Sequence, residues 1–136
     1  MIYLAQTDTT AGLLSKDPKK LNLVKERDLN TPCILTTSKF SGLRVPKKFK
    51  NSVRRLRKTT FIYPNSKSIR VVKECEHVKF LDKMGDMYST SANLSGMKFD
   101  EEWARSVADE IEGEDFKEGE SSKIYKISRS KIRKIR

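Results

Sequence analysis

Four short segments of the sequence carry side chains that could bind a charged small molecule. The first, 7–13 (TDTTAGL), places the hydroxyl groups of Thr7 and Thr9 directly after an apolar stretch that is typical of a strand. Hydroxyl and carboxylate groups at the carboxyl end of a strand suit a polar ligand site in an open α/β sheet. The same residues also fit an ordinary turn held by side-chain hydrogen bonds.

The second segment contains two cations, Lys25 and Arg27, near the expected end of a helix. Residues two apart do not share a helix face, so these cations can converge on one triphosphate only if the backbone leaves the helix there. The next residues, 28–30 (DLN), favour such a change of direction. A charged turn exposed to solvent is the alternative interpretation.

The third segment, 59–72, reads as two strands with Thr60 on one and Arg70 on the other. Arg70 stands alone in the apolar run 69–72. If that strand is internal, the guanidinium needs a partner, because an unpaired buried charge is expensive. An edge strand whose arginine reaches solvent is the alternative.

The fourth segment, 89–96 (STSANLSG), follows another expected strand and is rich in hydroxyl and amide groups. Its side chains, including Ser91 and Asn93, and its backbone amides offer donors for phosphate or carboxylate oxygens. A loop that caps a helix has a similar composition, so this segment alone does not define a site.

Apolar patterns and end signals predict the elements that must position these side chains. Pro18 after Asp17 predicts a helix start, and Gly85 and Gly113 each predict a helix end. Strands are expected over 2–6, 32–37, 59–63, 69–72, 87–90, 123–127 and 131–135, and helices over 18–27, from 46 onward, and over 76–84 and 100–112. Interleaved strands and helices predict an α/β fold, a twisted mixed sheet with flanking helices in one domain over 1–136.

The clearest of these helices is 100–112. Acidic residues lie at its start, and Trp103, Val107 and Ile111 recur at i, i+4 and i+8. That spacing predicts one apolar stripe facing the core.

The charge of the chain is strongly uneven. The 136 residues carry a net charge of +11, yet residues 29–73 contain twelve cations and no acid, and residues 100–120 contain ten acids against two cations. The positive field of the basic segment attracts phosphate, in a nucleotide or in a nucleic-acid backbone. A solvated basic surface is the alternative interpretation.

Several classes of protein are disfavoured by the same composition. No apolar run approaches the ~18 residues of a membrane span, and the apolar stretch at 2–5 is too short for a secretory signal, so a cytoplasmic protein is expected. The two cysteines, Cys33 and Cys75, form no CxxC or Cys/His pattern, so neither a metal site nor a disulfide scaffold is expected.

Taken in order, the four segments resemble the motifs of the YrdC-like family, the threonylcarbamoyl-AMP synthases that begin threonylcarbamoyladenosine formation in tRNA. The match covers nearly the whole chain, and its most specific part is 90–96 (TSANLSG). The matching residues are Thr7-Asp8-Thr9 with Gly12-Leu13, Lys25-x-Arg27, Thr60, Ile69-Arg70-Val71, Thr90 to Gly96, Ser121 to Ile124, and Ile135-Arg136.

The resemblance implies a YrdC-like fold with a basic concave face and an L-threonylcarbamoyladenylate synthase, a nucleotidyltransferase. Such an enzyme condenses L-threonine, bicarbonate and ATP to threonylcarbamoyl-AMP and pyrophosphate, with Mg²⁺ expected beside ATP. Charge stabilisation and positioning suffice for this reaction, so no protein nucleophile, catalytic residue or metal-ligating residue is expected.

Roles carry over from the resemblance position by position. Lys25, Arg27, Ser91, Asn93 and Arg136 would bind ATP. Thr7, Thr9 and Arg70 would bind threonine, and Thr60 and Ser122 would line the cleft. The implied partners are a tRNA or double-stranded RNA on the basic face and a transferase acting later in tRNA modification.

Two other functions compete with the enzyme. A non-catalytic YrdC-like module for double-stranded RNA or tRNA is favoured by the twelve cations in 29–73. An interaction protein that docks the acidic segment 100–112 on a basic partner ranks last, because that segment already has a core-facing stripe.

Overall fold

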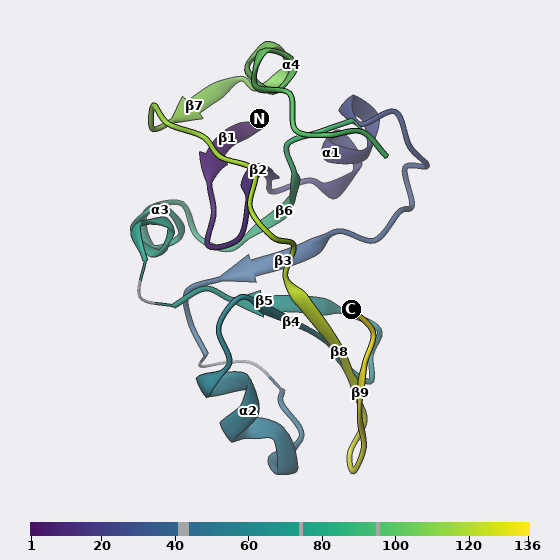
Figure 1. Ribbon diagram of the computed structural model, residues 1–136. Coiled ribbons are helices and arrows are strands. Elements are labelled where there is room, and N and C mark those ends of the chain that lie inside the picture. The colour runs from purple at the N-terminus through teal and green to yellow at the C-terminus, as the bar shows by residue number, and fades with distance from the viewer. Residues whose placement is uncertain (41–43, 74, 95) are drawn as a thin grey trace.

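One mixed β-sheet runs through the whole molecule (Figure 1). The computed structural model describes residues 1–40, 44–73, 75–94 and 96–136, and within these ranges nine strands lie in the order β7-β1-β2-β6-β3-β5-β4-β8-β9. The strands are β1 (Tyr3–Gln6), β2 (Ala11–Ser15), β3 (Ile34–Thr37), β4 (Thr59–Ile62), β5 (Ser68–Val71), β6 (Met87–Ser91), β7 (Glu110–Glu112), β8 (Lys123–Ile127) and β9 (Ile132–Lys134).

Parallel and antiparallel pairs alternate irregularly across this sheet. The pairs β1/β7, β3/β5 and β4/β8 are parallel, and the other five pairs are antiparallel. The helices in the described ranges are α1 (Pro18–Val24), α2 (Lys50–Arg55), α3 (Glu76–Met84) and α4 (Glu101–Val107), with a 3₁₀ turn at Lys47–Phe49. The predicted α/β fold with a mixed sheet and flanking helices is therefore confirmed.

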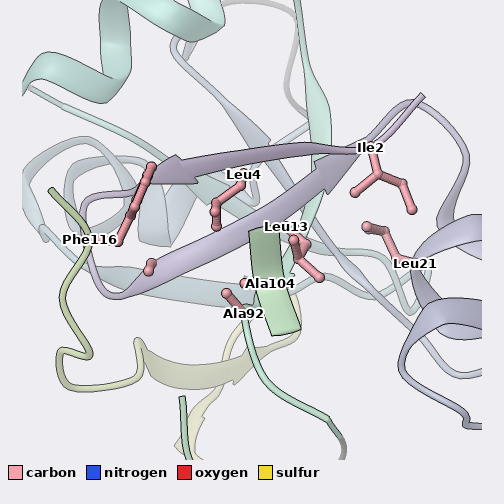
Figure 2. Packing of buried hydrophobic residues seen from close by; sticks show 8 residues of the cluster. Ile2, Leu4, Leu13, Leu21, Ala92, Ala104 and Phe116 are labelled. Atoms are coloured by element: carbon pink, nitrogen blue, oxygen red, sulfur yellow. The ribbon is translucent and has the colours of Figure 1, made fainter. Parts of the chain in front are cut away.

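The core lies in three clusters because the sheet presents different faces to different helices. Figure 2 shows one cluster, in which Leu4 and Leu13 of the β1–β2 hairpin lie among side chains that include Leu21 of α1 and Ala104 of α4. Leu14, the next residue of β2, points to the opposite face, as strand alternation requires, and belongs to a cluster with α3 residues. A third cluster packs α2 against the β4, β5 and β8 end of the sheet.

Local signals explain several boundaries. The Asp17 side chain accepts a hydrogen bond from the Lys19 amide at 3.0 Å, and Pro18 occupies the first helical position, as predicted. Helix α3 covers Glu76–Met84 and is followed by Gly85 at φ 84°. A left-handed residue at that place favours glycine and ends the helix.

The helix predicted over 100–112 is wrong in its second half. Helix α4 ends at Val107, and Glu110–Glu112 forms the edge strand β7 beside β1. The reason is the open edge of the N-terminal strand: the Asp109 and Glu110 amides donate to the Ile2 carbonyl at 2.8 and 3.2 Å, and the Asp109 carboxylate accepts from the Ile2 amide at 2.7 Å. Ile111 is consequently 42% exposed instead of facing the core.

Strand β2 had no predicted counterpart. All five of its residues are buried, so its sequence AGLLS lacks the alternation that marks a half-exposed strand.

Within the described ranges, none of the helices combines the length and apolar character that crossing a membrane requires.

Candidate ligand pocket

A cavity of about 340 Å³ lies over the centre of the sheet. It is lined by the β1–β2 turn, the loop after α1, strands β5 and β6, and the segment that leads into β8. Seven of the ten predicted site residues line it, namely Thr7, Thr9, Arg27, Arg70, Ser91, Ser122 and Arg136. The other three, Lys25, Thr60 and Asn93, do not reach its surface.

The backbone leaves the helix between Lys25 and Arg27, as the sequence required for the two cations to converge. Helix α1 ends at Val24, and Glu26 adopts a left-handed conformation with φ 55°. This single residue turns the chain, so that Lys25 points to the end of β6 and Arg27 lines the cavity. The alternative of a fully solvated charged turn is therefore wrong for both residues.

Lys25 lies beneath the pocket wall formed by Ser91. Its ammonium donates to the Ser91 carbonyl at 2.7 Å and to the Ser91 hydroxyl at 3.3 Å, and its side chain is buried. Burial, and secondarily the nearby Arg27 charge, lowers the pKa of Lys25 to about 8. Both of these hydrogen bonds go to neutral oxygens, so the positive charge of Lys25 is not compensated by them.

Arg27 is held at its inner end and reaches the cavity with its outer end. Its Nε donates to Asn22 Oδ1 at 2.6 Å, while Nη2 lies 3.4 Å from the Thr90 hydroxyl and 3.5 Å from Cys33 Sγ. Neither Asn22 nor Cys33 was predicted to belong to the site. The only sequence signal for Asn22 was a polar residue between the apolar positions of a short helix.

Arg70 is paired with a carboxylate, that of Asp8, as expected for a charge in an apolar internal strand. Strand β5 lies between β3 and β4, so the edge-strand alternative is wrong. The Nε and Nη2 atoms of Arg70 each lie 3.1 Å from Asp8 Oδ1. Burial lowers the pKa of Arg70, and the Asp8 charge opposes that shift. Arg70 lines the cavity, whereas its counter-charge Asp8 does not.

Thr60, Ser122 and Arg136 form one group at the far wall. The Thr60 and Ser122 hydroxyls lie 2.8 Å apart, and Arg136 donates from Nε to the Ser122 carbonyl at 2.9 Å and from Nη2 to its hydroxyl at 3.3 Å. Thr60 is fully buried and acts on the cavity only through Ser122.

The Asn93 side chain turns into its own loop. Its amide donates to the carbonyls of Leu94 and Met97 at 2.8 and 2.7 Å, which holds the loop after β6 in shape. Ser95, part of the motif noted in the sequence, lies outside the described residues.

Residues 116–122, which we call the strap, cross the β1–β2 turn and deliver Ser121 and Ser122 to the cavity. The Ala11 amide donates to the Lys117 carbonyl at 3.0 Å, and the Gly119 amide donates to the Thr10 hydroxyl at 3.0 Å. A Cβ atom at Gly119 would overlap the Thr9 carbonyl oxygen, so only glycine fits there.

The pocket wall is cationic and rich in hydroxyl groups. No Asp or Glu is among the described residues that line it, and no cluster of three or more His, Cys, Asp or Glu side chains suited to a metal occurs in the described part of the chain. Protein-bound Mg²⁺ prefers carboxylate oxygens and substrate phosphates. The described residues of the pocket wall therefore do not form a Mg²⁺ site of their own, and the expected Mg²⁺ would have to rely on phosphate oxygens.

Comparison with known proteins gives a fold but no close relative in sequence. No protein-family model and no curated protein matches this sequence. Among solved structures, a double-substituted form of P. abyssi Sua5 matches 99% of the chain with a TM-score of 0.81 at 16% identity, and P. abyssi Sua5 complexed with L-threonine matches 93% with a TM-score of 0.75 at 16% identity. E. coli YciO matches 99% with a TM-score of 0.77 at 15% identity.

The extent of these matches differs between the proteins. The chain spans 82% of YciO but only about half of the two Sua5 chains, 52% and 47%. The fold of this chain is thus the Sua5/YrdC fold, and the family resemblance seen in the sequence is confirmed at the level of the fold.

Proposed function

We propose that the protein is an L-threonylcarbamoyladenylate synthase, which uses ATP, L-threonine and bicarbonate. The observation that carries this proposal is the cavity itself. Cations from three separate segments, Arg27, Arg70 and Arg136, meet there with a wall of hydroxyl groups and no acid among its described lining residues. Such a pocket favours a ligand with several negative charges.

The fold supports the same assignment. One of the matching structures, P. abyssi Sua5, is a complex with L-threonine, and the motifs of this chain follow the order of the YrdC-like pattern. Tertiary structure brings most of the residues of those motifs to one cavity, although the first and the last of them, Thr7 and Arg136, are more than 100 positions apart in sequence.

The reaction would need positioned charges more than acid–base groups. A C–N bond forms between the threonine amine and the bicarbonate carbon, and water leaves. A carbamate oxygen then bonds to the α-phosphorus of ATP, and pyrophosphate leaves. Arg27 and Arg136 would stabilise the negative charge of the phosphates, and the positive charge of Lys25, beneath Ser91, would add to that stabilisation. Arg70 would bind the threonine carboxylate.

Pyrophosphate release is the test. Purified protein given ATP, bicarbonate and Mg²⁺ is expected to release pyrophosphate only when L-threonine is added. Folded protein without threonine-dependent release would contradict the enzyme proposal.

The cations can be tested separately from turnover. Arg27→Ala is expected to weaken ATP binding by about tenfold or more, since hydrogen bonds to charged groups contribute roughly 1.5–3 kcal/mol. Lys25→Ala is also expected to weaken ATP binding, because it removes a positive charge that is buried beneath the Ser91 wall of the pocket. Lys20→Ala, a change of the same type at an exposed position of α1, is the matched control and should bind ATP as the wild type does. Unchanged affinity in both the Lys25 and the Arg27 variant would show that neither residue contributes to ATP binding.

A second candidate function is RNA binding, with or without catalysis. The observation that favours it is the basic face, which we define as the exposed cations of 44–58 and 123–136. The two segments lie side by side: Lys48 donates to the Ser130 carbonyl at 2.9 Å, and Pro46, Lys47, Lys48 and Arg129 line a common hollow. Neither segment contains an acid, and the second ends at Arg136 in the cavity wall.

An RNA on this face would lie beside the pocket that makes the activated threonine. The partners proposed with it are a tRNA or another double-stranded RNA, and a transferase that consumes the adenylate.

A further inference from the structure

The Asn22 side chain uses all of its hydrogen-bonding positions. It lies on α1 and is fully buried. Its amide nitrogen donates to the carbonyls of Leu29 and Thr31 at 3.0 and 2.9 Å. Its oxygen accepts from Arg27 Nε at 2.6 Å and lies 3.5 Å from Cys33 Sγ. An asparagine amide has two donor positions and two acceptor positions, and all four are occupied.

All four partners belong to one loop, residues 27–33. This loop contains no helix or strand, so its path depends on the hydrogen bonds that it makes. The Arg27 amide also donates to the Asn22 carbonyl at 3.1 Å. Asn22 therefore joins the helix to the beginning, middle and end of the loop that carries Arg27.

The bond to Nε determines how Arg27 meets the cavity. Because Asn22 occupies Nε, the guanidinium is fixed at its inner side, and its two terminal nitrogens are the groups that can turn toward a ligand. The amide does this without carrying a charge. The positive charge of Arg27 thus stays available for an anion, in contrast to Arg70, whose charge is balanced by Asp8.

We propose that Asn22 is a positioning residue for the nucleotide, which fixes Arg27 for phosphate binding and keeps its charge uncompensated. The inference rests on the proposed function, because it takes the ligand of Arg27 to be the phosphate chain of ATP. It adds a residue that the motifs did not include and explains why a neutral amide is needed there.

Asn22→Asp is the discriminating change. It keeps the size of the side chain and the acceptor for Arg27, but it removes both donors and places a negative charge against the guanidinium. ATP affinity, measured by calorimetry, is expected to fall by about tenfold or more, as expected for losing a charge-assisted contact. Asn51→Asp, the same change at an exposed position of α2, is the matched control and should leave ATP affinity unchanged.

A double-mutant cycle separates positioning from general damage to the fold. If Asn22 acts through Arg27, Asn22→Asp should alter the ATP Kd by less than about twofold when Arg27 is already methionine. Asn22→Ser removes the amide without adding a charge, and it replaces the aspartate variant in the cycle if thermal melting shows that variant unfolded at the assay temperature. The same loss and the same coupling are expected for it.

The outcomes distinguish the two claims. If the wild type does not bind ATP, the proposed function fails, and the inference falls with it. If the wild type binds ATP but the folded Asn22 variant binds it within about twofold of the wild type, the inference alone is wrong. A tenfold loss that persists in the Arg27→Met background would also overturn it, because Asn22 would then act on the fold and not through Arg27.

Discussion

At the scale of single residues, the site consists of cations whose partners set how much charge each offers. Arg70 is balanced by Asp8, whereas Lys25 makes its two hydrogen bonds to neutral oxygens of Ser91. A buried ammonium with neutral partners holds its proton less firmly, and the pKa of Lys25 falls to about 8 for that reason.

This lowered pKa predicts a pH dependence of ATP binding. Lys25 is charged below about pH 8 and neutral above it, so ATP affinity should be highest below pH 8 and should fall as the pH rises further. Bound phosphate favours the charged form, which moves the midpoint upward in the complex. Calorimetry between pH 6.5 and 9.5 would measure this, and Lys25→Met should flatten the curve. An equally steep fall in that variant would show that another group titrates.

The residue types of the site could be predicted from the sequence, but some of their partners could not. A lone arginine in an apolar strand requires a counter-charge, and this requirement is visible in residues 69–72. That the counter-charge is Asp8, 62 positions away, depends on β5 and the β1–β2 turn lying together in space. Asn22 gave almost no signal, because its importance comes from the loop that folds around it.

At the scale of elements, the strap is the segment on which the cavity wall depends. It contains no helix or strand between 116 and 122, so its position is set by contacts with the β1–β2 turn. At Gly119 the backbone lies so close to the Thr9 carbonyl that no Cβ atom fits between them.

Gly119→Ala is therefore expected to push the strap away from the turn and to move Ser121 and Ser122 out of the cavity wall. Overpacking of this kind costs about 1–3 kcal/mol, and thermal melting should show a loss of stability of that size. The affinity for ATP, for threonine or for both should fall as well, because the cavity wall is displaced. Glu120→Ala, an exposed neighbour on the same strap, is the control. Wild-type stability and affinity in Gly119→Ala would show that the strap accommodates a side chain there.

Some helix boundaries were predictable from local signals, whereas the helix end predicted from Gly113 was wrong, because a strand precedes that glycine. Asp17 with Pro18 begins α1, and Gly85 follows α3, at the predicted places. The error in 100–112 has the opposite cause: the sequence there suits a helix, but the free edge of β1 takes residues 110–112 as a strand. Pairing with a distant strand overrides local propensity.

At the scale of the whole molecule, charge is separated along the sheet. The basic face and the C-terminal strands lie at one end, whereas the acidic residues of α4 and β7 lie at the other, as Figure 1 shows for the elements concerned. The cavity lies between the two ends, lined by residues from both parts of the sheet.

This separation predicts salt-dependent RNA binding through the basic face. Affinity for a double-stranded RNA should fall steeply with salt concentration, because each phosphate contact releases counterions. A triple alanine variant on the face should lower the slope of log K against log salt by up to about three. The substituted residues are Lys50, Arg55 and Lys131.

A matched triple variant removes the same charge from elsewhere on the surface. Its positions are Lys20, Lys83 and Lys98, all exposed. It should keep the wild-type slope. A flat salt dependence in the wild type, or equal slopes in the two variants, would contradict RNA binding at this face.

The sequence by itself determined the class of the fold, most element boundaries, the uneven charge and the residue types suited to anions. These features follow from local chemistry: caps, turns, apolar periodicity and the count of charges in a segment. Tertiary structure alone decided which of those residues share a cavity, that Asp8 balances Arg70, that Asn22 holds the Arg27 loop, and that 110–112 is a strand. Each of these depends on contacts made in the folded chain between different segments. The local sequence of one segment does not specify which other segment it will contact.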